Sequence, residues 1–378
     1  MSLASFARRL LLSAAVGAIA AGSAAAQNPA TPGFDFSGII YANYQQRTDS
    51  SAKAANAGKA ANKFDLERVY LTFKMPTGDR TSIRVTTDVL NTTAGGYYSG
   101  WTVRIKYAYL QWNFANDIGG TKGFNALARF GVLHTMLIDH EEGFWPRYIS
   151  QTDVERAGFF SSADVGAAGL VTLPNKMGEV YATITNGPGY GSAETDRFKD
   201  FAGRVTLTPL ANGSTILKNL AISPYVYAGH TASKFQSSGI SDGLTRNRFG
   251  VFVGSKDPRL TFGVGYGQRT ETTEGGTTAA TRTTADVTGK LTSGFVVLRP
   301  AAFSDPKSAA AKFALIGRMD SFQPDDSKDP KTLLTIFGVS YDVNSKTTFS
   351  IDYQDLAPKS GSTTAETKTL FLHTSFSF

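Results

Sequence analysis

The chain has 378 residues, 38 Lys and Arg against 31 Asp and Glu, a formal net charge of +7, four His and no Cys. Without Cys there is no disulfide framework, no thiolate metal site and no cysteine nucleophile. No run of about 20 apolar residues occurs after the first segment, which excludes a membrane protein built from helical spans.

The first segment, residues 1–26, has the pattern of a bacterial secretory signal peptide. Arg8 and Arg9 precede a short apolar stretch, and three Ala before Gln27 fit the small-residue cleavage pattern. A single membrane anchor is the alternative, but the apolar stretch is short and ends in small residues. Cleavage removes two Arg and no acid, so a single mature domain, 27–378, carries 7 − 2 = +5.

After this segment, the dominant pattern is a two-residue alternation. In 101–109 every odd position is large and apolar, whereas the even positions are Thr, Arg, Lys and Ala. The same period recurs in 69–74, 83–89, 260–266 and 349–353. A transmembrane barrel predicts such segments of about ten residues, with lipid-facing apolar side chains alternating with a polar lumen. A soluble sandwich is the alternative, and it would need a second sheet to cover the aromatic residues.

About sixteen segments are long enough to cross a bilayer at a tilt, since each crossing needs about ten residues. The predicted strands are 34–46, 63–75, 80–91, 101–114, 126–134, 164–173, 176–186, 201–209, 219–231, 244–256, 259–270, 284–298, 311–322, 331–343, 347–357 and 367–378.

The connections between these segments alternate in length, as periplasmic turns and extracellular loops do. Short turns at 76–79, 174–175, 256–258 and 344–345 contain Pro, Gly, Asn and Asp, which favour tight turns. The longer connections are 47–62, 91–100, 135–163, 187–200, 232–243, 271–283, 323–330 and 358–366.

The last strand carries the sharpest local signal. Leu370, Leu372, Phe376 and Phe378 alternate with smaller residues, and the chain ends on an aromatic residue. This resembles the C-terminal signal that the bacterial outer-membrane barrel assembly machinery recognises, so that machinery is an expected partner. Other aromatic residues are predicted to form girdles at the membrane interfaces: Trp101, Tyr107, Tyr109, Phe114, Tyr225, Tyr227, Tyr266, Tyr341 and Tyr353.

Several segments resemble the phosphate-selective porin family of the porin O and P type. They are 34–114 with Gly38, 64–74 and 104–112 within it, Phe130-Gly131, and 159–166. The resemblance implies a sixteen-stranded barrel, a homotrimer, passage of small hydrophilic solutes, and an in-folded constriction loop after the fifth strand. That family uses an arginine ladder and a lysine cluster, whereas the basic residues here are scattered and no lysine cluster is evident.

The connection 135–163 is the predicted constriction loop. It is long yet rich in aromatic and aliphatic residues, so packing inside a lumen suits it better than disorder. We therefore predict an all-β fold, a transmembrane antiparallel β-barrel with this loop folded inside. Its charged residues either narrow the pore or pin the loop to the wall, and both roles are compatible: Asp139, Glu141, Glu142, Arg147, Asp153 and Arg156.

Basic residues on the polar strand faces are the predicted pore lining, because Arg on a lipid face costs about 2–4 kcal/mol at the membrane midplane. Positions at the rims, solvated or bound to lipid headgroups, are the alternative. The residues are Arg68, Arg84, Arg104, Lys106, Arg129, Arg204, Arg248, Arg269 and Arg318. Basic rings favour anions, so weak anion selectivity is predicted.

The sequence thus predicts an outer-membrane porin for passive diffusion of small hydrophilic solutes. The alternatives are a channel specific for phosphate or another small anion, a barrel without an open pore, and a barrel enzyme. The enzyme needs a Ser–His or Asp–His pair, and the sequence leaves His134, His230 and His373 without a recognisable partner motif. Outer-membrane lipid and lipopolysaccharide are expected partners, nucleic acid is not, and neither a cofactor nor a metal is expected.

Overall fold

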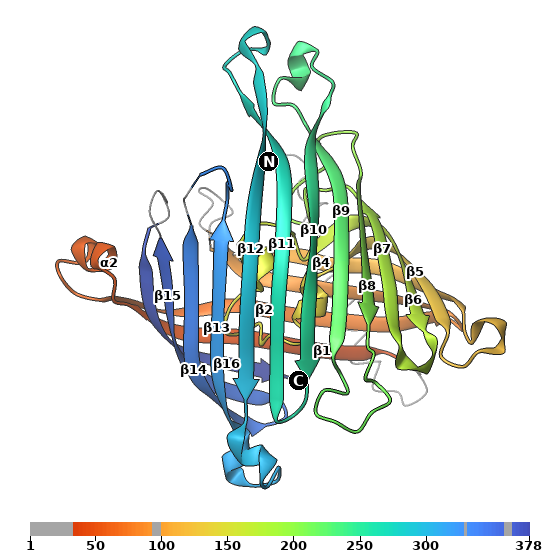
Figure 1. Cartoon of the computed structure of the whole chain (residues 1–378), viewed down its shortest axis with the longest axis vertical. Helices are drawn as coiled ribbons and strands as arrows, with labels where there is room; N and C mark the ends of the chain where they lie inside the picture. The colour runs from red at the N-terminus through yellow and green to blue at the C-terminus, as the bar shows by residue number, and fades with distance from the viewer. Residues whose placement is uncertain (1–32, 93–99, 329–330, 359–364) are drawn as a thin grey trace, which may run out of the picture.

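The structure is a computed structural model and describes residues 33–92, 100–328, 331–358 and 365–378 (Figure 1). The predicted signal peptide 1–26 lies outside the described residues. So do parts of three predicted long connections, at 93–99, 329–330 and 359–364.

Sixteen antiparallel strands close into one barrel, as predicted. Every strand pairs with its neighbours in the sequence, and β1 pairs with β16, so the sheet has no free edge. The strands are β1 (Asp35–Arg47), β2 (Ala61–Gly78), β3 (Thr81–Thr92), β4 (Gly100–Ala115), β5 (Asn125–His134), β6 (Ala163–Leu173), β7 (Gly178–Thr185), β8 (Asp200–Leu207), β9 (Ala221–Ala232), β10 (Gly243–Lys256), β11 (Leu260–Gly275), β12 (Thr283–Leu298), β13 (Phe313–Gln323), β14 (Thr332–Asn344), β15 (Thr347–Pro358) and β16 (Thr367–Ser377).

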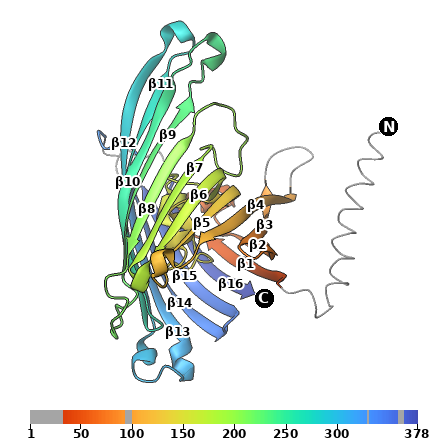
Figure 2. The ribbon, with the colours of Figure 1, turned by 90° about the vertical axis from the view of Figure 1, so that its right-hand side faces the viewer.

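The predicted strand ends fall within three residues of the observed ones except at the end of β11. That strand continues to Gly275, past the predicted end at 270. Hairpins β9–β10 and β11–β12 project furthest from the barrel (Figures 1 and 2).

The barrel closes where the two ends of the described sheet meet. The backbone of Phe378 exchanges two hydrogen bonds with Gly38, at 3.1 and 3.0 Å. A Cβ built on Gly38 would lie 2.3 Å from the Phe378 ring, so the ring needs a glycine beneath it. The terminal aromatic residue therefore packs on the first strand and covers the closing seam.

In the described ranges, short helices occur in the connections between strands. They are α2 (Ser50–Ala55), α3 (Ile138–Glu141), α4 (Asp153–Arg156) and the 3₁₀ helices η1 (Ile118–Gly120), η2 (Pro174–Lys176), η3 (Gln236–Ser238), η4 (Ala279–Thr281), η5 (Pro300–Phe303) and η6 (Ala309–Lys312). Among the described residues, no helix is long and apolar enough to cross a membrane.

All the predicted long connections lie at one end of the barrel, here called the loop end, and the predicted short turns lie at the other, the turn end. The turn end is not uniformly short. Residues 208–220 join β8 to β9, and 299–312, which contain η5 and η6, join β12 to β13 (Figure 1).

The outward face of the barrel is apolar. Its most exposed large side chains include Phe64 at 85%, Phe130 at 72% and Phe337 at 60%. A closed sheet with an apolar exterior has all its backbone groups paired and is suited to a bilayer.

The predicted faces of β4 are wrong after Lys106, because the strand contains a β-bulge. Trp101, Val103 and Ile105 point outward as expected, but the register with β3 shifts between Thr86 and Thr87, opposite Lys106. The extra residue turns the following side chains over, because the period of a strand is two. Tyr107 and Tyr109 are therefore buried inside the barrel and do not belong to a girdle.

The girdle prediction is also wrong for Tyr225 and Tyr227 of β9. Tyr225 is 4% exposed and Tyr227 bonds Asp200, both on the inner side, whereas Val226 points outward and is 63% exposed. Both faces of β9 carry apolar residues, so alternation in the sequence alone could not distinguish them. The inner tyrosines join a core that lies between the barrel wall and the in-folded loop.

Candidate functional site: the constriction of the barrel

The connection from β5 to β6 folds into the lumen, as predicted. Its apolar residues are buried there, with Leu137 and Ile138 at 0%, Phe159 at 1% and Trp145 at 2% exposure. Aliphatic and aromatic side chains inside a barrel remove apolar surface from water, and this is why the segment enters the lumen. We call residues 135–162 the constriction loop.

The first part of the constriction loop, which includes His140 and Gly143, contacts β9 and β10. His140 Nε2 lies 2.9 Å from Ser223 Oγ, and Lys256 Nζ donates to the Gly143 carbonyl at 2.7 Å. Burial, and then the positive charge of Arg204, lower the pKa of His140 to about 3, so it remains neutral. Its role here is that of a neutral hydrogen-bond partner of the wall.

The later part of the constriction loop, from Ile149 to Arg156, binds to β13 and β15. Gln354 donates to the Ile149 carbonyl at 3.0 Å, and Arg318 donates to the Gln151 carbonyl at 2.8 Å. Arg156 pairs with Asp320 at 2.5 Å. These contacts tie the constriction loop to the wall opposite its root.

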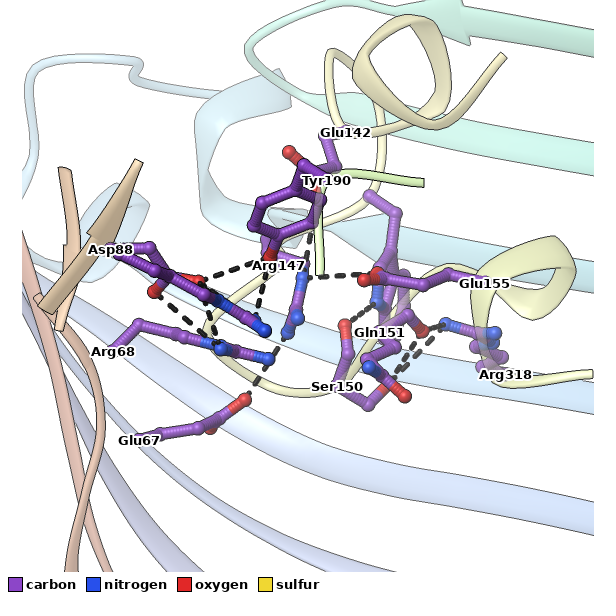
Figure 3. Close-up of polar contacts among 12 residues, drawn as sticks. Glu67, Arg68, Asp88, Glu142, Arg147, Ser150, Gln151, Glu155, Tyr190 and Arg318 are labelled. Carbon is purple, nitrogen blue, oxygen red and sulfur yellow. Dashed lines mark hydrogen bonds and ion pairs between the residues drawn. The ribbon is translucent and has the colours of Figure 1, made fainter. Parts of the chain in front are cut away.

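Arg147 joins the constriction loop to β2 (Figure 3). Its guanidinium lies 3.2 Å from Glu67, 3.2 Å from Glu142 and 3.5 Å from Glu155, and its side chain is 5% exposed. Glu67 reaches this position because it is the extra residue of a bulge between β2 and β1, next to Arg68. One buried cation thus holds three carboxylates.

Glu141 and Asp153 form a second internal contact between α3 and α4. Burial raises the pKa of Glu141 well above its usual range, and the Asp153 charge raises it further. Protonated Glu141 can donate to Asp153, and this keeps the net charge low beside Arg318 and Asp320. Both side chains are buried, at 3% and 7% exposure, and do not face the open lumen.

The opposite side of the lumen, formed by β3, β4 and β5, carries cations that face the acids of the constriction loop. His134 Nδ1 lies 2.9 Å from Asp139, and Arg84 Nη1 lies 3.2 Å from His134 Nε2. Burial raises the pKa of Asp139, but the His134 hydrogen bond and charge and then Arg84 lower it, and the net pKa is lowered. Asp139 is therefore ionised opposite Arg84, and its side chain is 48% exposed.

Aromatic rings support three of the cations on this side. The Arg84 guanidinium lies 4.8 Å from the Tyr107 ring, and Lys106 Nζ lies 4.3 Å from the Tyr70 ring. Arg129 lies 5.2 Å from the Tyr109 ring. In the described part of the chain, no carboxylate lies within ion-pair distance of Arg84, Lys106 or Arg129. We call these three the basic wall.

The other predicted pore residues also lie on the inner side, but acids pair with them. Arg68 and Arg104 share Asp88, and Arg204 bonds Glu179. Arg248 and Arg269 approach Glu271, and Arg318 pairs with Asp320. The role of all nine residues in conduction stays a prediction.

A cavity of about 1100 Å³ opens on the turn-end side of the constriction loop. It is lined by Arg129, Arg204, Asp139 and Glu179, and by three lysines that the sequence separates widely, Lys176, Lys218 and Lys256. The sequence indicated no lysine cluster because each lysine belongs to a different connection or strand end.

Two further features were not predicted from the sequence. His134 and His373 are not isolated, since they lie 2.9 Å from Asp139 and 3.1 Å from Asp352. However, Arg84 occupies the second nitrogen of His134, so no Ser–His–acid chain forms there. The hydroxyl of Tyr190, between β7 and β8, lies 3.1 Å from Asp88. In the sequence, only the glycines around Tyr190 distinguish this position.

Within the described ranges, no group of three His, Asp or Glu side chains is arranged to hold a metal ion. The acidic sequence 139–142 is among these residues.

Known structures share this architecture. The anion-selective porin from Comamonas acidovorans matches over 91% of this chain and 99% of its own, with a TM-score of 0.62 and 11% identity. The chain has a porin fold. The outer membrane channel DcaP of Acinetobacter baumannii matches with a TM-score of 0.58 and 12% identity over 91% and 97% of the two chains.

A trimer form of OmpT, an outer membrane protein of Vibrio cholerae, matches this porin fold with a TM-score of 0.55 and 12% identity, over 91% and 99% of the two chains. No family model matches the sequence, and no curated protein does. At these identities the likeness concerns the fold.

Proposed function

We propose that this protein is an outer-membrane porin, a water-filled channel for passive diffusion of small hydrophilic solutes with a weak preference for anions. The observation that supports the anion preference is the basic wall, where Arg84, Lys106 and Arg129 rest on aromatic rings and face Asp139. A ring orders a cation without cancelling its charge, so the wall keeps a positive potential where the loop narrows the lumen.

The surroundings support the same function. The exterior is apolar and the strands close fully, which suits a lipid bilayer. One of the known structures that share this fold is that of a porin named as anion-selective.

Reversal potentials in planar bilayers under a KCl gradient test the proposal. The triple variant Arg84→Gln, Lys106→Gln, Arg129→Gln removes the basic wall. One unit charge at about 4 Å is worth about 1 kcal/mol in water, so several-fold loss of anion preference is expected. The matched control, Lys53→Gln, Lys59→Gln, Lys63→Gln, removes the same charge near α2 and keeps the wild-type preference. Absence of conductance in the wild type refutes the channel, and a cation preference refutes the anion preference.

A more specific anion channel, for phosphate or another small anion as in the porin O and P type, is the second candidate. The favouring observation is the set Lys176, Lys218 and Lys256 around the cavity that also contains Arg129 and Arg204. Phosphate added to the KCl recordings distinguishes the two. Block of the chloride current that disappears when the three lysines are Gln supports the specific channel, and no block supports general diffusion.

Assembly as a homotrimer is proposed because OmpT is described in a trimer form and because Phe64 and Phe130 leave large apolar side chains on the outward faces of β2 and β5. Recognition of the Phe378 strand by the barrel assembly machinery, and contact with lipopolysaccharide, are part of the same proposal. Mass measurement in detergent tests the trimer.

A further inference from the structure

A second segment packs beside the constriction loop. It is the first part, residues 186–190, of the connection from β7 to β8. The Gly187 N–H donates to Asp164 at 2.6 Å, and the Tyr190 N–H donates to the Ala163 carbonyl at 2.9 Å. Both acceptors lie at the start of β6, where the constriction loop rejoins the wall.

Glycines make the local turn that directs Tyr190. The sequence is Asn186-Gly-Pro-Gly-Tyr-Gly191, and Gly187 and Gly189 have φ angles of +112° and +82°. Only glycine adopts such angles without strain. A Cβ on Gly189 would also lie 2.6 Å from Ser161 Oγ, so the turn packs directly against the constriction loop.

The Tyr190 side chain crosses from this turn to the β3–β4 wall (Figure 3). Arg104 Nη2 donates to its hydroxyl at 2.8 Å, and the hydroxyl donates to Asp88 at 3.1 Å. The Arg104 guanidinium lies 4.5 Å from the ring centre. Asp88 is fully buried and is shared with Arg68, so the acceptor is fixed in place.

The bridge lies on the loop-end side of the basic wall. β4 runs from the loop end towards the turn end, so Arg104 precedes Lys106 along the lumen. β3 runs the other way, so Asp88 is nearer the loop end than Arg84. A solute that enters from the loop end therefore meets Tyr190 and Arg104 before it meets the cations of the basic wall.

We propose that Tyr190 is a specificity-determining residue that forms a second narrowing, in series with the constriction loop, and limits the size of the solutes that pass. The proposal rests on the channel function above. A rigid ring that is bonded at both its hydroxyl and its backbone restricts the lumen, because pore width and lining groups set permeability.

Single-channel conductance and proteoliposome swelling with sugars of increasing size test the role of Tyr190. Tyr190→Ala is expected to raise conductance by at least ~1.5-fold and to admit larger sugars, and Tyr190→Trp to lower both. The expected changes have opposite signs, so a general loss of stability cannot produce both. Tyr266→Ala, on the outward face, is the matched control and keeps wild-type values.

The outcomes separate this proposal from the channel function. An open wild-type channel whose conductance and sugar limit are the same in Tyr190→Ala and Tyr190→Trp overturns the role of Tyr190 and leaves the channel function standing. A wild type without conductance overturns the channel function itself.

Discussion

Two parts of the lumen wall hold their charges in different ways. At the contacts that hold the constriction loop, guanidinium groups pair with carboxylates, as Arg318 does with Asp320 and Arg147 with Glu67. On β3–β5, Arg84, Lys106 and Arg129 rest on tyrosine rings.

The difference assigns separate tasks to the two parts. A buried ion pair that loses one partner leaves an uncompensated charge, so the paired groups resist change and hold the loop. A cation on a ring keeps its electrostatic field, so the basic wall acts on ions in the lumen. Substitutions at the ion pairs that hold the loop are therefore expected to change stability, and those on the basic wall to change selectivity.

The largest effect is expected at Arg147. Arg147→Ala leaves Glu67, Glu142 and Glu155 close together without their cation, and removal of one partner of a buried pair costs about 3–5 kcal/mol. Thermal unfolding in detergent, followed by circular dichroism, should show a clearly lower midpoint. Arg84→Ala is the control from the basic wall and should lower it much less. An equal decrease of the unfolding midpoint in both variants would contradict the difference between the ion pairs that hold the loop and the basic wall.

A second test uses the pH dependence of the free energy of unfolding, to which Glu141 of the constriction loop contributes. Because burial raises the pKa of Glu141, the folded protein holds a proton that the unfolded chain releases. The resulting stabilisation is complete below the ordinary carboxyl pKa and is lost as pH rises through the raised pKa, by about 1.4 kcal/mol for each pH unit between the two.

Unfolding midpoints measured from pH 5 upward follow this loss. Glu141→Gln cannot ionise and should flatten the fall of the midpoint with rising pH, whereas Glu194→Gln, in the connection 186–199, should leave it unchanged. A wild-type profile that is retained in Glu141→Gln would mean that Glu141 is not the proton-holding group.

The smallest effect is expected at the ring beneath the basic wall. Tyr107→Leu removes the surface that supports both Arg84 and Lys106, and such cation–ring contacts contribute about 0.5–2 kcal/mol. The anion preference, read from reversal potentials, should fall, but by less than in Arg84→Gln. Tyr341→Leu, on the outward face, serves as the comparison. A Tyr107→Leu channel with full anion preference would show that the ring does not order these cations.

Much of the architecture follows from local sequence. Alternation along 69–74 or 349–353 depends on the backbone geometry of a strand, which points successive side chains to opposite faces. Turn residues such as Gly78 and Asn344 lie where strands end. The sixteen strands, their bounds and the in-folded loop were therefore predictable, because each depends on patterns within a few residues of one another.

The candidate site was predictable only in part. The side on which Tyr107 and Tyr109 lie depends on one extra residue at Lys106, and a bulge is defined by pairing with the neighbouring strand. The path of the constriction loop across the lumen depends on partners such as Arg318 and Gln354, which lie 167 and 205 residues away in the chain.

The sequence by itself determined that this chain forms a strand-built, closed barrel with an apolar exterior, since these properties arise from the residue type at every second position. Only the tertiary structure decided which charges are cancelled and which remain free. Lys176, Lys218 and Lys256 meet around one cavity, and Tyr190 reaches Asp88, because closure of the sheet brings distant connections to the same lumen. Electrostatic effects depend on distance in space, and that distance is set by strand register and loop path.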